Sequence, residues 1–117
     1  MTPEQIKADY RRSMDAVGEI VTIRRYTGNG PNRPRFDADV RARVVDYEPD
    51  ELVGPIVQGD RKLIVLAEDL IAAQVPLDLR KGDKVVVRGR ELNIEAPDDN
   101  TRRVAGVLIA YELQVRG

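Results

Sequence analysis

The chain has 117 residues, of which 42% are hydrophobic and 33% are charged, and this fits one folded domain over residues 1–117 rather than a disordered chain. Its 19 basic and 20 acidic residues leave a net charge of −1, which argues against a dedicated nucleic-acid binder with a strong basic excess. The chain has no Cys and no His, so disulfides, Ser-His or Cys-His nucleophiles and the usual zinc sites are excluded.

The N-terminal segment is predicted to form an amphipathic helix over about 3–16. Thr2 can cap it, Pro3 fits the first helical position, and Gln5 stands where a capping box takes Glu or Gln. Gly18 is expected to end it. Apolar side chains recur at helical spacing: Ile6, Tyr10, Met14 and Val17. This narrow stripe can pack on the rest of the chain or on a neighbouring subunit.

After the helical segment 1–18, the pattern over 19–117 predicts β structure. Alternating or β-branched stretches predict six strands, at 20–26, 36–47, 61–66, 84–88, 91–95 and 103–117. A short helix is expected over 68–75, where Pro76 must end it. The expected fold is therefore mainly β: a small six-stranded β-barrel with an N-terminal helix and one short inserted helix.

The last predicted strand, 103–117, is the longest. One of its faces is wholly apolar and is expected to be buried: Val107, Ile109, Tyr111, Leu113 and Val115. The other face is apolar at first and polar later. A strand in this position suggests a compact β domain that ends inside its own core or at an assembly contact.

Two connections between predicted strands are rich in Gly and Pro. Residues 27–34 form a clear loop, in which Gly28-Asn29-Gly30 is a turn and not a phosphate-binding loop, because Pro31 follows and no helix opens there. The second connection, Glu48 to Gly59, is longer than a tight hairpin, and connections of that length are often functional.

The sequence gives little support for catalysis. Ser13 is the only serine and lies in the predicted helix. Three groups of carboxylates are conceivable acid/base or Ca²⁺ groups: Asp98 with Asp99, Asp37 with Asp39, and Glu48 with Asp50 and Glu51. Each lies in a loop or on a polar strand face, and none has EF-hand spacing. We therefore expect no enzyme, no metal and no cofactor.

Arginines occur in pairs along the chain. The pairs are Arg24 with Arg25, Arg33 with Arg35, Arg41 with Arg43, and Arg102 with Arg103. Such side chains can pair with acids of a partner or bind phosphate. One open alternative is an OB-like barrel that binds nucleic acid through Arg24, Arg41 and Arg43, although few aromatic residues lie nearby for base stacking.

Three stretches carry a resemblance to a known family. They are 59–70, with a Gly-Asp turn before a Val-rich strand; 80–92, with Arg-Lys-Gly-Asp before the next strand; and 104–117, with its Ile-Ala-Tyr-Glu-Leu-Gln-Val-Arg-Gly ending. In this order they resemble the head-completion proteins of long-tailed bacteriophages, also called head–tail joining or stopper proteins, which have relatives in gene transfer agents. The N-terminal half is similar mainly in layout.

The resemblance implies a structural virion protein of the neck. Its subunits would form a homo-oligomeric ring between the adaptor above and a tail terminator or tail tube protein below, around packaged double-stranded DNA. The connection between the second and third strands would be the plug of the channel: Glu48, Pro49, Asp50, Glu51, Leu52, Val53, Gly54, Pro55, Ile56, Val57, Gln58 and Gly59. Its prolines and glycines would serve as bend points and its apolar residues would meet their equivalents around the ring.

Candidate ring or partner contacts under this resemblance are Arg24, Arg25, Arg33, Arg35, Arg41, Arg43, Tyr111, Gln114 and Arg116. The loop from Thr27 to Arg35 is a second candidate contact with the adaptor or the tail. No apolar run approaches the ~18 residues that a membrane span requires, and no secretory signal is visible. The expectation is a protein made in the host cytoplasm and incorporated into the virion, with no membrane partner.

Overall fold

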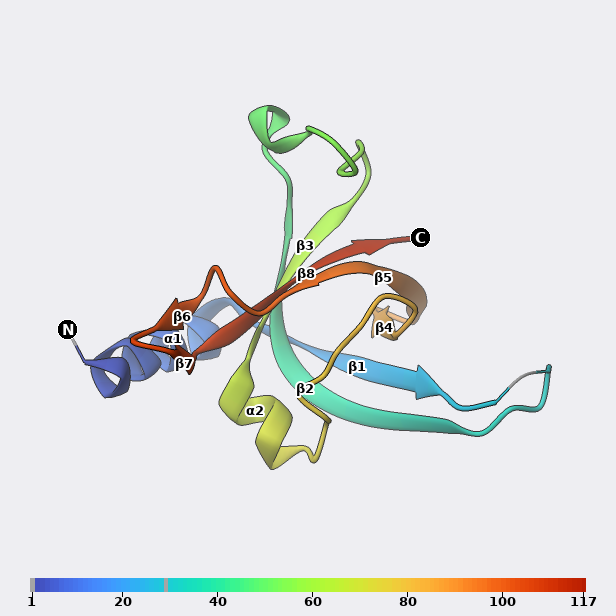
Figure 1. Ribbon diagram of the computed structural model, residues 1–117, viewed down its shortest axis with the longest axis horizontal. Helices are drawn as coiled ribbons and strands as arrows, with labels where there is room; N and C mark the ends of the chain where they lie inside the picture. The colour runs from blue at the N-terminus through green and yellow to red at the C-terminus, as the bar shows by residue number, and fades with distance from the viewer. Residues whose placement is uncertain (1, 29) are drawn as a thin grey trace.

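A computed structural model describes residues 2–28 and 30–117 of the chain, and the predicted mainly β fold is confirmed (Figure 1). Six strands form a closed antiparallel barrel in the order β1-β2-β3-β8-β5-β4. Their bounds are β1 Glu19–Tyr26, β2 Arg35–Asp46, β3 Arg61–Leu66, β4 Lys84–Val87, β5 Arg90–Asp98 and β8 Ala110–Arg116. Asn29, part of the expected loop 27–34, lies outside the described residues.

The barrel interior is filled by aliphatic side chains from all six strands. Alternate residues of each strand point inward, because successive side chains of a strand leave opposite faces. On β2 the inward residues Val40 and Ala42 are buried, and on β3 Leu63 and Val65 have no exposed surface. The chain has few aromatic residues, so small and branched side chains fill this narrow core.

Helix α1 (Pro3–Val17) packs on the outside of the barrel. The capping box is present, since Thr2 Oγ1 accepts from the Gln5 N–H at 3.2 Å and Gln5 Oε1 accepts from the Thr2 N–H at 2.8 Å. Met14 is buried in a small outer cluster against Leu66 and Ala110. Val17, placed on the same stripe by its spacing, is 53% exposed, so the helix covers the barrel incompletely at its C-terminal end.

Helix α2 (Ala67–Ala72) follows β3 directly and ends earlier than the predicted 75. Gln74 adopts a positive φ of 61°, and the Val75 N–H returns to the Leu70 carbonyl at 2.8 Å, so the chain turns out of the helix before Pro76. The helix is tied to α1 by Arg11, whose guanidinium lies 2.7 Å from Glu68 and 2.6 Å from Asp69. Two helices remote in sequence are thereby joined on the barrel surface.

The predicted strand 103–117 is wrong in its first half. A two-residue turn at Ala105 and Gly106, with φ of 50° and 79°, folds 103–108 into a separate hairpin. Its strands are β6 (Arg103–Val104) and β7 (Val107–Leu108), which lie outside the barrel (Figure 1). Val107 is consequently 36% exposed instead of buried, whereas the inward face from Ile109 onward is buried as expected.

The connections leave the barrel in different directions (Figure 1). The β1–β2 hairpin extends to one side and the β2–β3 connection rises from another, while α1 and the β6–β7 hairpin lie on the opposite side from the β1–β2 hairpin. The molecule therefore presents several separate projections around one barrel. The longest connection between neighbouring barrel strands is the one that leads from β2 to β3.

Candidate functional site

The β2–β3 connection contains a short 3₁₀ turn, η1 (Pro49–Glu51), and otherwise irregular backbone. Every residue from 48 to 59 is described, and none of them is buried. Val53 is 66% exposed and Val57 is 47% exposed. Because no side chain of this segment enters the core, polar contacts must hold it in place.

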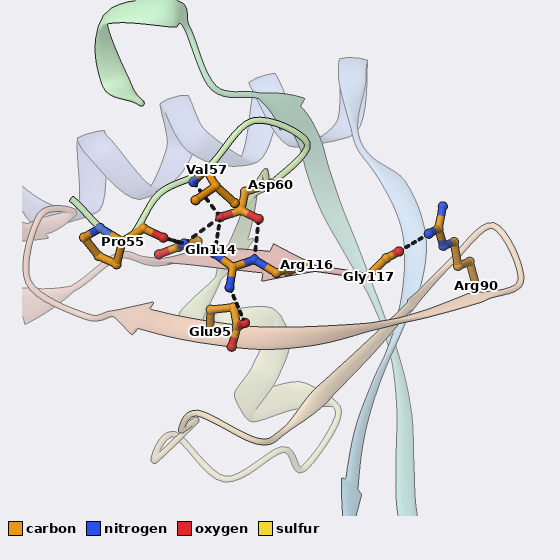
Figure 2. A network of polar contacts seen from close by, with 8 residues as sticks. All are labelled: Pro55, Val57, Asp60, Arg90, Glu95, Gln114, Arg116 and Gly117. Atoms are coloured by element: carbon orange, nitrogen blue, oxygen red, sulfur yellow. Dashed lines mark hydrogen bonds and ion pairs between the residues drawn. The ribbon is translucent and has the colours of Figure 1, made fainter. Parts of the chain in front are cut away.

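Those contacts centre on Asp60, the residue that ends the connection (Figure 2). Its carboxylate is only 4% exposed and accepts from Arg116 Nε at 2.8 Å, Arg116 Nη2 at 2.9 Å and Gln114 Nε2 at 2.8 Å. It also accepts from the Val57 backbone N–H at 3.2 Å. A carboxylate with this many donors is strongly held in its charged form.

The same two β8 side chains hold the connection itself. Gln114 Nε2 donates to the Pro55 carbonyl at 3.2 Å, and Arg116 Nη2 donates to the same oxygen at 3.0 Å. Figure 2 shows both side chains turned from the end of β8 toward Asp60 and Pro55. The last third of the connection is thus fastened to the barrel by an arrangement that depends on one carboxylate, and we call Asp60, Gln114 and Arg116 the anchor.

A β-bulge completes the anchor. The register between β5 and β8 shifts between Ile94 and Ala96, which leaves Glu95 without a cross-strand partner. The Glu95 carboxylate instead accepts from Arg116 Nη1 at 2.9 Å. Arg116 therefore lies between two carboxylates and a carbonyl, which fixes the direction of its planar group.

A second tie holds the start of the connection. Lys62 Nζ, on β3, lies 2.7 Å from Glu51 and 3.5 Å from Glu112, and it also faces the ring of Tyr47 at 5.2 Å. The hydrogen bond from Lys62 lowers the pKa of Glu51. Burial, with the nearby Glu112, raises the pKa of Tyr47 to about 12, so this tyrosine stays neutral at physiological pH.

The anchor has a clear electrostatic signature. The hydrogen bonds from Arg116 hold the pKa of Asp60 down to about 2, against the opposing effect of burial, with further lowering by Gln114 and the Val57 N–H. Asp60 is therefore ionised throughout the physiological range. Its role is to orient donors, and a proton-transfer role is not supported because both of its carboxylate oxygens accept from fixed donors.

Most of the arginines expected to contact a partner are engaged within the chain. Arg24, on the outer face of β1, lies 2.9 Å from both Asp37 and Glu91. Arg25 lies 2.8 Å from Asp83, whose side chain is almost fully buried. These residues stabilise the fold, and their charge is not free for phosphate.

The remaining arginines are more open. Arg33 stacks on the ring of Tyr26 at 4.0 Å, and Arg35 lies 3.4 Å from Asp37, both on the β1–β2 hairpin. Arg41 is half-buried beneath α1 and donates to the Gly18 carbonyl at 3.2 Å. Arg43 is exposed beside α1. These differences in partner and exposure mean that no single basic groove is formed by Arg24, Arg41 and Arg43.

Two expected surface contacts, Tyr111 and Gln114, require correction because their side chains are buried. Tyr111 is 3% exposed, lies in the core and donates its hydroxyl to the Leu77 carbonyl. Gln114 is 6% exposed and, with the half-buried Arg116, belongs to the anchor. Alternation along β8 places Gln114 on the outer face of the barrel, where the folded-back β2–β3 connection covers it.

The roles of Asp60 and Glu95 are not expected from the sequence, because their partner Arg116 lies on a strand distant from both in the chain. Asp60 had one visible signal, its place directly after a flexible Gly59 and before a strand, which is typical of a turn residue. Glu95 had none, since a bulge cannot be read from one sequence. Within residues 2–28 and 30–117 no cluster of Asp or Glu has the arrangement of a metal site, and no described helix is long and apolar enough to cross a membrane.

Comparison with known proteins adds no relative: no protein-family model matches this chain, and no curated protein matches it.

Proposed function

We propose that this protein is a head-completion, or stopper, protein of the neck of a long-tailed phage or gene transfer agent. It forms a ring that joins the portal–adaptor to the tail and closes the DNA channel after packaging, with no catalytic role. The observation that carries the proposal is the β2–β3 connection, which leaves a rigid barrel at a defined root and keeps its side chains out of the core.

The build of the connection supports the role of a channel element. Its end is fastened through Pro55 and Asp60 to β8, so a ring of barrels would carry its loops in fixed positions. Val53 and Val57 are exposed and available for contact. Glu48 and Asp50 have no ion pair among the described residues, and their charge would repel DNA phosphate, which suits a channel that must later release DNA.

The alternative of a nucleic-acid-binding barrel receives less support. It requires free arginines on one sheet face, but Arg24 is neutralised by two carboxylates and Arg41 is turned beneath α1. Tyr26, the nearest aromatic residue on that face, is already covered by Arg33. A sheet face of this kind offers neither the charge nor the bare ring that single-strand recognition uses.

The test is a capsid DNA-retention assay in a producing strain that lacks this gene. Complementation with a chain in which residues 50–57 are replaced by a short Gly-Ser linker is expected to give particles that lose packaged DNA. The matched control replaces 28–33 at the tip of the β1–β2 hairpin, which leaves the connection intact. Normal DNA retention with the 50–57 replacement would contradict the plug role.

A further inference from the structure

A groove lies between α1 and the barrel, with a volume of about 310 Å³. Its floor is apolar and its rim carries two arginines; the residues that matter are Tyr10, Met14, Val17, Ile64, Arg43 and Arg102. The volume is at the lower end of the range of ligand pockets, about 300–1,000 Å³, and suits a few side chains of a peptide segment. Val17 at its edge is 53% exposed, so the apolar floor continues to the surface.

The charge of the groove is positive and partly unused. Arg43 has no ion pair and no hydrogen bond among the described residues, whereas Arg102 donates to the Tyr10 hydroxyl at 2.7 Å and to Glu112 at 3.1 Å. The one acid at the rim, Asp9, is 3.3 Å from Arg12. An acidic group of an incoming segment would therefore meet Arg43 without displacing an existing pair.

The chain itself contains a segment with the complementary character. Over 48–53 it carries Glu48 and Asp50, neither of which has an ion pair within the described part of the chain, followed by the 66% exposed Val53. The segment thus has acidic side chains followed by an exposed apolar side chain. These match the unpaired arginine and the apolar floor of the groove.

We propose that segment 48–53 of one copy docks into the α1 groove of a second copy, with Val53 on the apolar floor beside Met14 and Val17 and an acid beside Arg43. The two surfaces differ, so repeated docking generates a ring when the rotation closes. This inference rests on the proposed function in one respect, because it names the contact that would hold the proposed ring together. It also assigns Val53 to a neighbour's groove instead of to its equivalents on the channel axis.

The contact is small, since it comprises one loop and one groove, and interfaces of limited area are weak in isolation. The free protein is therefore expected to show the contact only transiently. Because the chain has no cysteine, single introduced cysteines can trap it without background, and a mixture of two singly substituted chains can form a mixed disulfide only between copies.

The experiment oxidises an equimolar mixture of Val53→Cys and Val17→Cys chains, and the mixed disulfide and the two homodimeric disulfides are quantified by mass spectrometry of their disulfide-linked proteolytic peptides. The expected result is a mixed dimer in excess of the two homodimers and of the dimer from a control mixture of Val53→Cys with Leu77→Cys. Leu77 is 40% exposed and lies outside the groove. Cross-linking no faster than this control overturns the proposal, as does a dominant Val53→Cys homodimer.

A charge reversal separates docking from random collision. Arg43→Glu in the groove-bearing chain is expected to lower the yield of mixed dimer by about fivefold, the upper range for an exposed ion pair, and Asp50→Lys in the loop-bearing chain should restore it. Both positions are exposed, and urea unfolding checks that each variant keeps its stability. Failure of Arg43→Glu to change the yield contradicts the assigned contact.

The cross-linking result and the capsid assay can fail separately. A mixed dimer together with normal DNA retention after loss of 50–57 would leave the docking contact standing and remove the stopper role. Absence of the mixed dimer together with DNA loss from the loop-replaced capsids would do the opposite. A ladder of larger products from a chain carrying both cysteines indicates a ring or filament, whereas a product that stops at the dimer contradicts ring closure through this contact.

Discussion

Replacing Asp60 by Asn removes the charge on which the anchor depends. The fall of the Asp60 pKa from 3.8 to about 2 corresponds to about 2 kcal/mol of stability at neutral pH, because each pKa unit is worth about 1.4 kcal/mol. Arg116 is partly exposed, with 41% of its side-chain surface accessible, so water can solvate the guanidinium that is left behind. We therefore expect Asp60→Asn to lower the free energy of unfolding by about 2 kcal/mol. This is less than the roughly 3–5 kcal/mol lost when a fully buried ion pair is broken.

The stabilisation from Asp60 is expected to depend on pH. Because folding lowers the pKa of Asp60, its stabilisation is fully present above the unfolded-state pKa and is lost as pH falls through the folded-state value of about 2. The difference between wild type and Asp60→Asn should be constant from about pH 7 to pH 5, and should shrink to less than about half by pH 2.5. Urea unfolding followed by circular dichroism at each pH measures it.

Asp50→Asn is the matched control, since Asp50 is exposed and makes no ion pair among the described residues; its effect should stay within about 0.5 kcal/mol. Hydrogen exchange adds a local readout, because the Val57 N–H donates to Asp60 and should lose protection in Asp60→Asn alone. A stability difference that is as large at pH 2.5 as at pH 7, or no difference at all, would refute the electrostatic reasoning.

Three further substitutions test other parts of the structure by the same unfolding assay. Gly18→Ala should cost about 1–3 kcal/mol, because a Cβ there would lie 2.6 Å from the Met14 carbonyl oxygen although the backbone φ of −79° suits any residue; an unchanged midpoint would show that α1 shifts freely. Arg25→Ala should cost about 3 kcal/mol by leaving the buried Asp83 unpaired, and a loss below about 1 kcal/mol would mean that water reaches that carboxylate. Thr2→Ala should cost about 1 kcal/mol through loss of the helix cap, with no loss expected if α1 is held by packing alone.

The elements of this fold follow from local signals. The capping box at Thr2 and Gln5 and the strand at 61–66 were predicted from residue type and alternation, and the structure has them. The closed barrel was predicted from the number and spacing of short strands. The capping box and the individual strands depend on neighbours within a few residues, which is why one sequence suffices to predict them.

The break in the last strand was not predicted, although a signal was present. Alternation predicts a continuous strand through Val104-Ala105-Gly106-Val107. A small residue followed by Gly can also form a two-residue hairpin turn when both residues adopt positive φ, and Ala105 and Gly106 do so. The strand pattern on both sides of the turn is the same, so periodicity does not distinguish one long strand from a hairpin followed by a strand.

The anchor could not be predicted because it depends on tertiary neighbours. Gln114 and Arg116 were placed on the right strand, but their partner Asp60 comes from another strand and Glu95 from a bulge. The sequence likewise gives no sign that Tyr111 would reach the Leu77 carbonyl across the end of the core. Charged residues read as free surface are often paired across strands, and only the closed sheet determines which.

Electron microscopy of the portal vertex tests whether the β2–β3 connection lies across a DNA channel. Purified protein is added to DNA-filled, tailless capsids that lack it, and the portal vertex is reconstructed. We expect a new ring below the adaptor, with density from residues 54–59 directed to the channel axis. A vertex without added density, with free protein that binds oligonucleotides in a strongly salt-dependent manner, would contradict the account and point to a nucleic-acid module.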